Sequence, residues 1–83
     1  MVTTVEQSIR DYILSVYLEG EDPSELTVST PLISTGVLDS MATLKVALFL
    51  ESEFSISIAP HEITADYLDT IEKMAALVHS KNA

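Results

Sequence analysis

The sequence predicts an all-α fold: an up-and-down bundle of three main helices plus a short fourth helix. Three segments repeat apolar residues at the spacing of one helix face. Residues 55–58 alternate as a strand would, but four residues without a pairing partner do not predict a sheet. A long connection over residues 21–39 interrupts the helical pattern once. Together these features predict a single helical domain over residues 1–83.

The first helix is expected over residues 3–19. Two pairs at its start have the spacing of a capping box, Thr3 with Glu6 and Thr4 with Gln7. One apolar stripe then recurs at helical spacing: Val5, Ile9, Tyr12, Ile13 and Val16. Gly20 favours the end of the helix, because glycine readily adopts the left-handed conformation found there.

The connection over residues 21–39 contains Pro23, Pro31 and Gly36, which break any regular period. It also carries apolar residues that a disordered linker would lack: Leu26, Val28, Leu32, Ile33, Val37 and Leu38. A loop of this length inside a compact domain is usually functional or packed by its own side chains. We expect it to lie across the helices.

The second helix is expected over residues 40–53, and it is unusually apolar. Nine of the fourteen residues from Met41 to Phe54 are apolar, more than one buried face requires. At about 100° per residue, one face gathers Thr43, Val46, Ala47, Leu50 and Phe54, which we assign to the core. Met41, Leu44 and Leu48 lie on the opposite side, interleaved with Lys45 and Ser52. This second stripe has no evident partner within the chain.

The rest of the chain predicts an extended segment and two further helices. Ile56 or Ile58 is expected to point inward from the extended segment. Pro60 favours the start of a short helix over residues 60–65. The last helix is expected over residues 69–80, opened by a capping pair of Asp69 and Glu72. One face of that helix carries Ile71, Met74, Ala75 and Val78.

Charge and composition exclude several functions. Thirteen acidic residues against four basic ones give a formal net charge of −9, which disfavours binding to nucleic acid. The same charge steers the chain toward basic partner surfaces. Cysteine is absent, so thiolate metal sites and cysteine catalysis are excluded, and a reducing, cytoplasmic location is expected. The first residues turn polar at once, and no apolar stretch is long enough to span a membrane.

The ionisable residues do not suggest an enzyme. The chain has two histidines, His61 and His79, and neither lies near Ser40 in sequence. A serine hydrolase needs a base, an acid and an oxyanion site held together. No calcium-loop or histidine-ligand spacing is present, and the two glycines form no phosphate loop.

Ser40 is the candidate functional residue. Aspartate and serine are favoured helix caps, so Asp39-Ser40 taken alone predicts no more than the start of a helix. Three features point further. The positive end of a helix suits a phosphate-bearing group, the apolar stripe begins at the next residue, and the acidic domain has no catalytic groups of its own.

The chain resembles the acyl/peptidyl carrier family over nearly its full length. The most specific match is Gly36-Val37-Leu38-Asp39-Ser40-Met41, which is similar to the family's Gly-x-x-Asp-Ser-Leu signature. The spacing from Ser40 through residues 51–54 to Ile58, and the segment 69–71, are also similar. The family's architecture is three long helices, a short third helix and a long first loop.

The resemblance implies a non-enzymatic carrier. Ser40 would receive 4′-phosphopantetheine from coenzyme A through a phosphopantetheinyl transferase, and Asp39 would assist the docking of that enzyme. The thiol of the arm would hold an acyl or aminoacyl group as a thioester. An adenylating ligase would load it, and transferases, synthases or modifying enzymes would receive it. The resemblance also implies a partner-docking surface and a cargo groove on the two faces of this helix: Met41, Leu44, Lys45 and Leu48 would serve docking, and Thr43, Ala47 and Leu50 would line the groove.

Departures from the family narrow this interpretation. Ala42, Thr43 and Lys45 stand where fatty-acid-synthesis carriers typically have acidic residues, and methionine replaces leucine at position 41. We therefore expect a freestanding, monomeric carrier of a specialised pathway. The alternative is an unmodified helical interaction module in which Ser40 only caps its helix.

Overall fold

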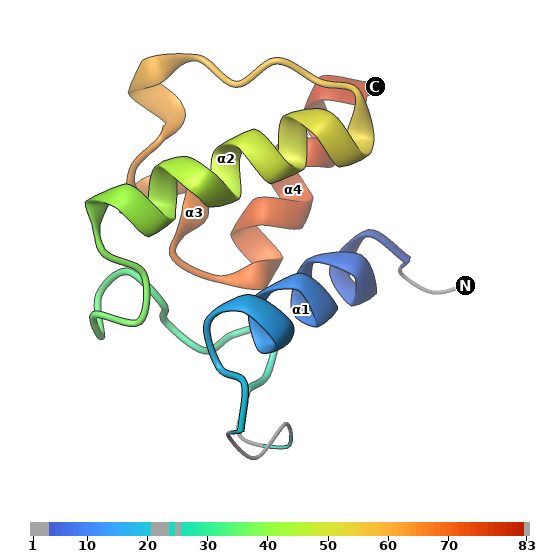
Figure 1. Ribbon diagram of the computed structural model, residues 1–83. Coiled ribbons are helices and arrows are strands. Elements are labelled where there is room, and N and C mark those ends of the chain that lie inside the picture. Colours follow the sequence, from blue (N-terminus) through green and yellow to red (C-terminus); the bar gives the residue numbers. More distant parts are fainter. Residues whose placement is uncertain (1–3, 21–23, 25, 83) are drawn as a thin grey trace.

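The computed structural model describes residues 4–20, 24 and 26–82, and over these residues four α-helices form the frame (Figure 1). They are α1 (Thr4–Val16), α2 (Ser40–Phe54), α3 (Ala65–Leu68) and α4 (Ile71–Asn82), with a 3-10 turn at Pro60–Glu62. No strand occurs in these residues, which confirms the all-α fold. The expected capping residue Thr3 and residues 21–23 of the long loop lie outside the described residues.

The core lies where α1, α2 and α4 meet, and α1 packs directly against α4. Helix faces and loop residues both contribute buried side chains to it: Ile9, Ile13, Leu26, Leu32, Leu38, Val46, Ala47, Leu50, Ile58, Leu68, Ile71, Met74, Ala75, Leu77 and Val78. The faces predicted to be inward in α2 and α4 are buried, with Phe54 only partly so. Ile58 is the residue of the 55–58 segment that is buried.

The end of α1 differs from the prediction. The helix stops at Val16, before the expected residue 19, and Val16 is 53% exposed instead of lying in the core. The amides of Tyr17 and Leu18 both donate to the carbonyl of Ile13, at 2.9 and 3.1 Å, and so close the helix early. Tyr17 and Leu18 then pack against the core in place of Val16.

The predicted short helix over residues 60–65 begins at Pro60 as expected, but its predicted extent is wrong. Glu62 closes a single 3-10 turn, because its Oε1 accepts the Ala59 amide at 2.9 Å and its own amide donates to the Ala59 carbonyl. Ile63 then leaves helical geometry, with φ −89° and ψ 65°. The short helix α3 begins only at Ala65 and is held by Leu68, which is fully buried.

The predicted Asp69–Glu72 capping pair is also wrong. α4 begins at Ile71, and Thr70 Oγ1 accepts the Lys73 amide at 3.1 Å in the capping role. The helix continues to Asn82, beyond the expected residue 80. The Asp69 carboxylate is free of the helix and is used elsewhere.

Asp69 binds three consecutive amides of the long loop. Its Oδ1 accepts from Leu32, Ile33 and Ser34 at 3.1, 2.8 and 3.0 Å, and its Oδ2 accepts from the Ser34 hydroxyl at 2.7 Å. The Leu32 amide also lies 2.7 Å from the Asp69 carbonyl oxygen. Successive amides that converge in this way form a concave anion site, filled here by a carboxylate of the same chain.

Two further contacts attach the loop to the helices. The Glu72 amide donates to the Val28 carbonyl at 3.0 Å, and Arg10 Nε donates to the Leu26 carbonyl at 3.1 Å. Leu26, Leu32 and Leu38 fill the space beneath. The expectation that the loop packs across the helices is therefore confirmed for its described residues.

The same contacts shift the acidity of Asp69. The Ser34 hydroxyl, together with the amides of Ser34, Ile33 and Leu32, holds the pKa of Asp69 below its ordinary value, although partial burial acts in the opposite direction. These hydrogen bonds therefore stabilise the fold while the carboxylate is ionised.

We predict that Asp69→Ala lowers the free energy of unfolding by about 2–4 kcal/mol near neutral pH, because loop amides lose a charged acceptor. The exposed residue Asp66, on α3, provides a matched control, and Asp66→Ala should change stability by less than about 0.5 kcal/mol. Urea unfolding followed by circular dichroism measures both. Equal effects of the two variants would contradict the role of Asp69.

A pH series tests the same contact through Asp69→Asn. Because the folded pKa of Asp69 is depressed, its contribution is complete above the unfolded pKa, about 4, and is lost as pH falls through the folded pKa. The stability difference between wild type and Asp69→Asn should therefore shrink in acid. A difference that stays constant or grows between pH 7 and pH 3 would contradict the assignment.

Candidate functional site

Asp39 begins α2 and supplies its cap. Its backbone is extended, with φ −81° and ψ −173°, and its Oδ1 accepts the Ala42 amide at 2.8 Å. Its carbonyl accepts both the amide and the hydroxyl of Thr43, at 2.8 and 2.7 Å. One residue therefore satisfies the amide of Ala42 with its side chain and the donors of Thr43 with its backbone.

Ser40 is the first residue of α2, and its side chain is not the cap. It is exposed, and none of the described residues hydrogen-bonds to its hydroxyl. The alternative in which Ser40 serves only as the helix cap is therefore wrong in its structural premise, because Asp39 performs that role. The Ser40 hydroxyl is left available at the positive end of a 15-residue helix.

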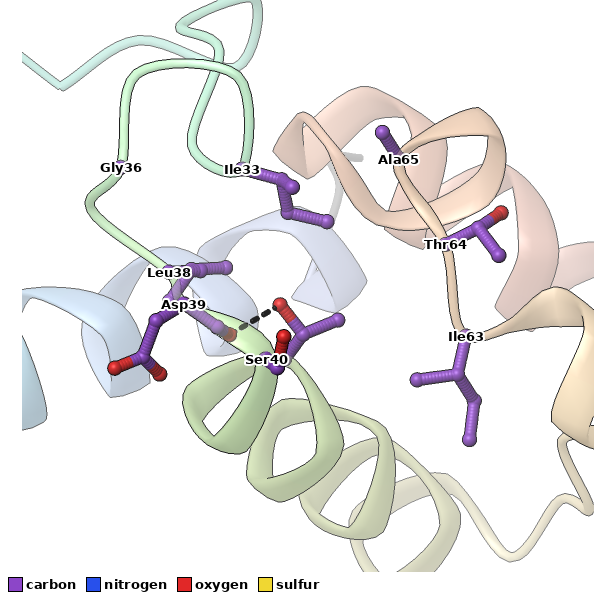
Figure 2. A pocket seen from close by; sticks show the side chains of 9 residues that line it. Ile33, Gly36, Leu38, Asp39, Ser40, Ile63, Thr64 and Ala65 are labelled. Atoms are coloured by element: carbon purple, nitrogen blue, oxygen red, sulfur yellow. Dashed lines mark hydrogen bonds between the residues drawn. The ribbon is translucent and has the colours of Figure 1, made fainter.

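An open pocket of about 440 Å³ lies beside Ser40. Figure 2 shows Ile33 and Ile63 on opposite sides of the space next to the serine, with the Asp39 carboxylate directed away from Ile63. The pocket is bordered by the long loop, the first turn of α2 and the segment before α3: Ile33, Gly36, Leu38, Asp39, Ser40, Thr43, Ile63, Thr64 and Ala65.

This pocket agrees only partly with the expected cargo groove. Thr43 lines it, but Ala47 and Leu50 are 1% and 0% exposed and lie in the core without bordering it. Sequence reasoning did not identify Ile63, Thr64 and Ala65 as part of the site, because residues 60–65 were assigned to one helix. Because the turn ends at Glu62, Ile63 leaves helical geometry and borders the same pocket as Ser40.

Residues 32–38 form a tight subloop that leads the chain to Asp39 and Ser40. The Leu38 amide donates to the Leu32 carbonyl at 3.0 Å, so the chain closes on itself just before Asp39. Gly36 has φ +87° within this turn, a conformation that residues with a Cβ rarely adopt. Leu32 thus belongs both to the contact with Asp69 and to the subloop that ends at the site.

The outward face of α2 is exposed along its length. Met41, Leu44 and Leu48 have exposed fractions of 62%, 43% and 54%, as the predicted orientation requires, and Lys45 is exposed among them. Single exposed apolar residues need no explanation, but three on one helix face form a patch suited to a partner.

Tyr17 joins the end of α1 to the first turn of α2 and was not identified from the sequence. Its hydroxyl donates to the Ala42 carbonyl at 3.4 Å. Burial, followed by the neighbouring Tyr12, raises the pKa of Tyr17 to about 12. Tyr17 therefore remains a neutral donor and holds the start of α2 in place.

Neither histidine borders the pocket beside Ser40. His61 and His79 are exposed, and His61 has its ring edge-on to Tyr67 at a centroid distance of 6.4 Å. Within the described ranges, no three His, Cys, Asp or Glu side chains are grouped as metal ligands. The helices of that part of the chain are too short or too polar to cross a bilayer.

Comparison with known proteins points to one kind of protein. The family model described as "Phosphopantetheine attachment site" matches residues 7–78. The "Probable acyl carrier protein PigG" of Serratia sp. (strain ATCC 39006) is 32% identical over 79 residues, which cover 95% of this chain and 90% of that protein.

Similar relatives include carriers of a different cargo. The "D-alanyl carrier protein" of Lacticaseibacillus casei (strain BL23) is 31% identical over 88% of this chain and 93% of its own length. The protein of the same name from Leuconostoc mesenteroides is 39% identical over 74% of this chain and 77% of its own length.

Measurements of unfolding free energy test whether Asp39, and not Ser40, caps α2. We predict that Asp39→Ala lowers the free energy of unfolding by about 1 kcal/mol, the usual cost of losing a helix cap. Ser40→Ala should change it by less than about 0.5 kcal/mol, since its hydroxyl has no partner among the described residues. Thermal and urea unfolding of the two variants measure this. A larger loss for Ser40→Ala than for Asp39→Ala would show that the roles are reversed.

Proposed function

This chain belongs to the family of carrier proteins that bear covalent 4′-phosphopantetheine, and we propose that Ser40 is the residue to which that group is attached. The observation that supports Ser40 most strongly is its exposed hydroxyl without a hydrogen-bond partner among the described residues, next to a separate capping residue. A hydroxyl that capped the helix would have to give up its hydrogen bond before a phosphate could be attached to it.

The residues around Ser40 fit a phosphate-bearing arm. The amides of Ser40 and Met41 belong to the first turn of α2, where no intrahelical carbonyl is available to them. Backbone donors and the helix dipole at such a position favour an attached phosphate. The pocket edged by Ile33 and Ile63 provides an apolar border where the arm leaves the helix.

The bound arm supplies a thiol that holds cargo as a thioester. The chain's own residues position and present that arm. Asp39 fixes the first turn of α2 and lies beside the attachment atom, where it would assist docking of the phosphopantetheinyl transferase. Met41, Leu44 and Leu48 would provide the apolar contact for each partner enzyme in turn. Since the family model and the relatives are those of carriers, we propose a carrier that is not itself an enzyme.

We further propose that the cargo is an acyl or aminoacyl group of a specialised pathway. The names of the relatives support both kinds of cargo, since they are acyl and D-alanyl carriers. An adenylating ligase would load the cargo onto the arm. Downstream transferases, synthases or modifying enzymes would then act on it or receive it. The chain would act as a monomer in the cytoplasm, where coenzyme A is available to its transferase.

The attachment site is tested by intact mass. Incubation with coenzyme A, Mg²⁺ and a promiscuous phosphopantetheinyl transferase should add one phosphopantetheine to the wild type and none to Ser40→Ala. Ser52→Ala is the matched control, because Ser52 is an exposed serine near the other end of α2, and it should be modified fully. A wild type that is not modified would favour the alternative of an unmodified interaction module. Modification of Ser40→Ala would show that another residue carries the phosphopantetheine.

The two faces of α2 should respond differently to the same substitution. We predict that Leu48→Gln leaves the circular dichroism spectrum unchanged but lowers kcat/KM for the transferase by about fivefold or more, because apolar contact is lost. Leu50→Gln should unfold much of the domain, because it buries an amide without partners in place of a fully buried leucine. Parallel losses of helicity in both variants would show that the faces are assigned wrongly.

A further inference from the structure

Lys45 lies in the middle of the exposed face of α2. It follows Met41 by four residues and precedes Leu48 by three, the two spacings that make side chains neighbours on a helix. It is exposed, and within the described part of the chain no carboxylate forms an ion pair with it. The described ion pair with a lysine is instead between Lys81 and Glu62, at 2.7 Å.

The charge of Lys45 is opposite to that of the chain as a whole. The formal net charge is −9, yet residues 40–50 contain no acidic residue, and Lys45 is their single ionisable side chain. The negative field of the domain still steers it toward basic surfaces at long range. At contact distance, however, a partner that covers α2 meets one cation surrounded by apolar side chains.

Lys45 also borders a shallow hollow on the surface of the domain. It has a volume of about 260 Å³ and lies between the end of α1 and the first turns of α2, lined by Tyr17, Val37, Asp39, Met41, Ala42 and Lys45. Asp39 and Lys45 are six residues apart, a rise of about 9 Å along the helix. A partner group that enters the hollow therefore meets a negative charge near Ser40 and a positive charge farther along α2.

Docking on this face would cover Lys45, and a covered ammonium without a counter-charge is strongly disfavoured. A partner cation at the same place would add repulsion. A charge at this position would therefore discriminate between partner surfaces of similar shape.

On the premise of the proposed carrier function, we propose that Lys45 is a specificity-determining residue. The partner enzymes of this chain present a carboxylate, set among apolar side chains, opposite Lys45, and enzymes that present a cation there dock more weakly. Met41 and Leu48 supply the apolar contact on either side of this charge pair.

The experiment uses a promiscuous phosphopantetheinyl transferase with a basic carrier-docking surface as the probe. Its kcat/KM is measured with wild type, Lys45→Gln and Lys45→Glu at low and high salt. Lys73→Glu is the matched control, since Lys73 is exposed on α4 and the substitution changes the net charge equally. A second series uses transferase variants in which each basic docking residue in turn is replaced by glutamate.

We expect Lys45→Glu to raise kcat/KM by about three- to tenfold at low salt, with Lys45→Gln between it and wild type. Lys73→Glu should have a much smaller effect, and high salt should remove the differences. One glutamate variant of the transferase should reverse the order and prefer Lys45.

If Lys45→Glu and Lys73→Glu raised kcat/KM equally, the effect would come from net charge alone, and the inference would be overturned. The absence of any transferase variant that prefers Lys45 would overturn it too. Both results leave the carrier function intact, provided that Ser40 is modified. A wild type that no transferase modifies would remove the carrier function and this inference together.

Discussion

The carboxylate of Asp69, bound to the amides of Leu32, Ile33 and Ser34, is the contact on which the arrangement of this domain depends. The described loop residues 26–39 form no helix or strand, so their buried backbone amides need other acceptors. One carboxylate at the junction of α3 and α4 accepts from three of them. Because Asp69 lies far along the chain from these amides, the contact closes the bundle as well as the loop.

The position of Ser40 follows from that closure. Leu32 is held by Asp69 and accepts the Leu38 amide, so the loop delivers Asp39 to the start of α2 in an extended conformation. Asp39 then caps the helix, and the neighbouring serine keeps its hydroxyl exposed. Because Asp39 caps the helix and Ser40 does not, the site is suitable for a covalent modification. Attachment to Ser40 removes no contact seen among the described residues.

Much of this could be predicted from the sequence, because helical periodicity reports burial directly. The inward and outward faces of α2 follow from residue spacing alone, and so does the buried face of α4. The Gly-x-x-Asp-Ser motif also indicated Ser40 as the candidate attachment residue, which remains a proposal. The errors lie where a local rule competes with a distant contact. Asp69 has the spacing of a helix cap, but three loop amides make a better partner for its carboxylate than one amide of α4. Val16 continues an apolar stripe, but Tyr17 and Leu18 displace it by ending the helix. Proline at position 60 does start a turn, but the turn ends before Ile63, which borders the pocket beside Ser40, and no spacing in the sequence shows this.

The central claim is that Ser40, and no other hydroxyl of the chain, carries the phosphopantetheine. Trypsin should release residues 11–45 as one peptide, since Arg10 and Lys45 are successive basic residues, and this peptide contains several other serines and threonines. Fragment-ion mass spectrometry of the peptide from protein modified in its own cells tests the claim most directly. The account predicts a single phosphopantetheine on Ser40. Its presence on another hydroxyl, or a peptide that is never modified, would contradict the account.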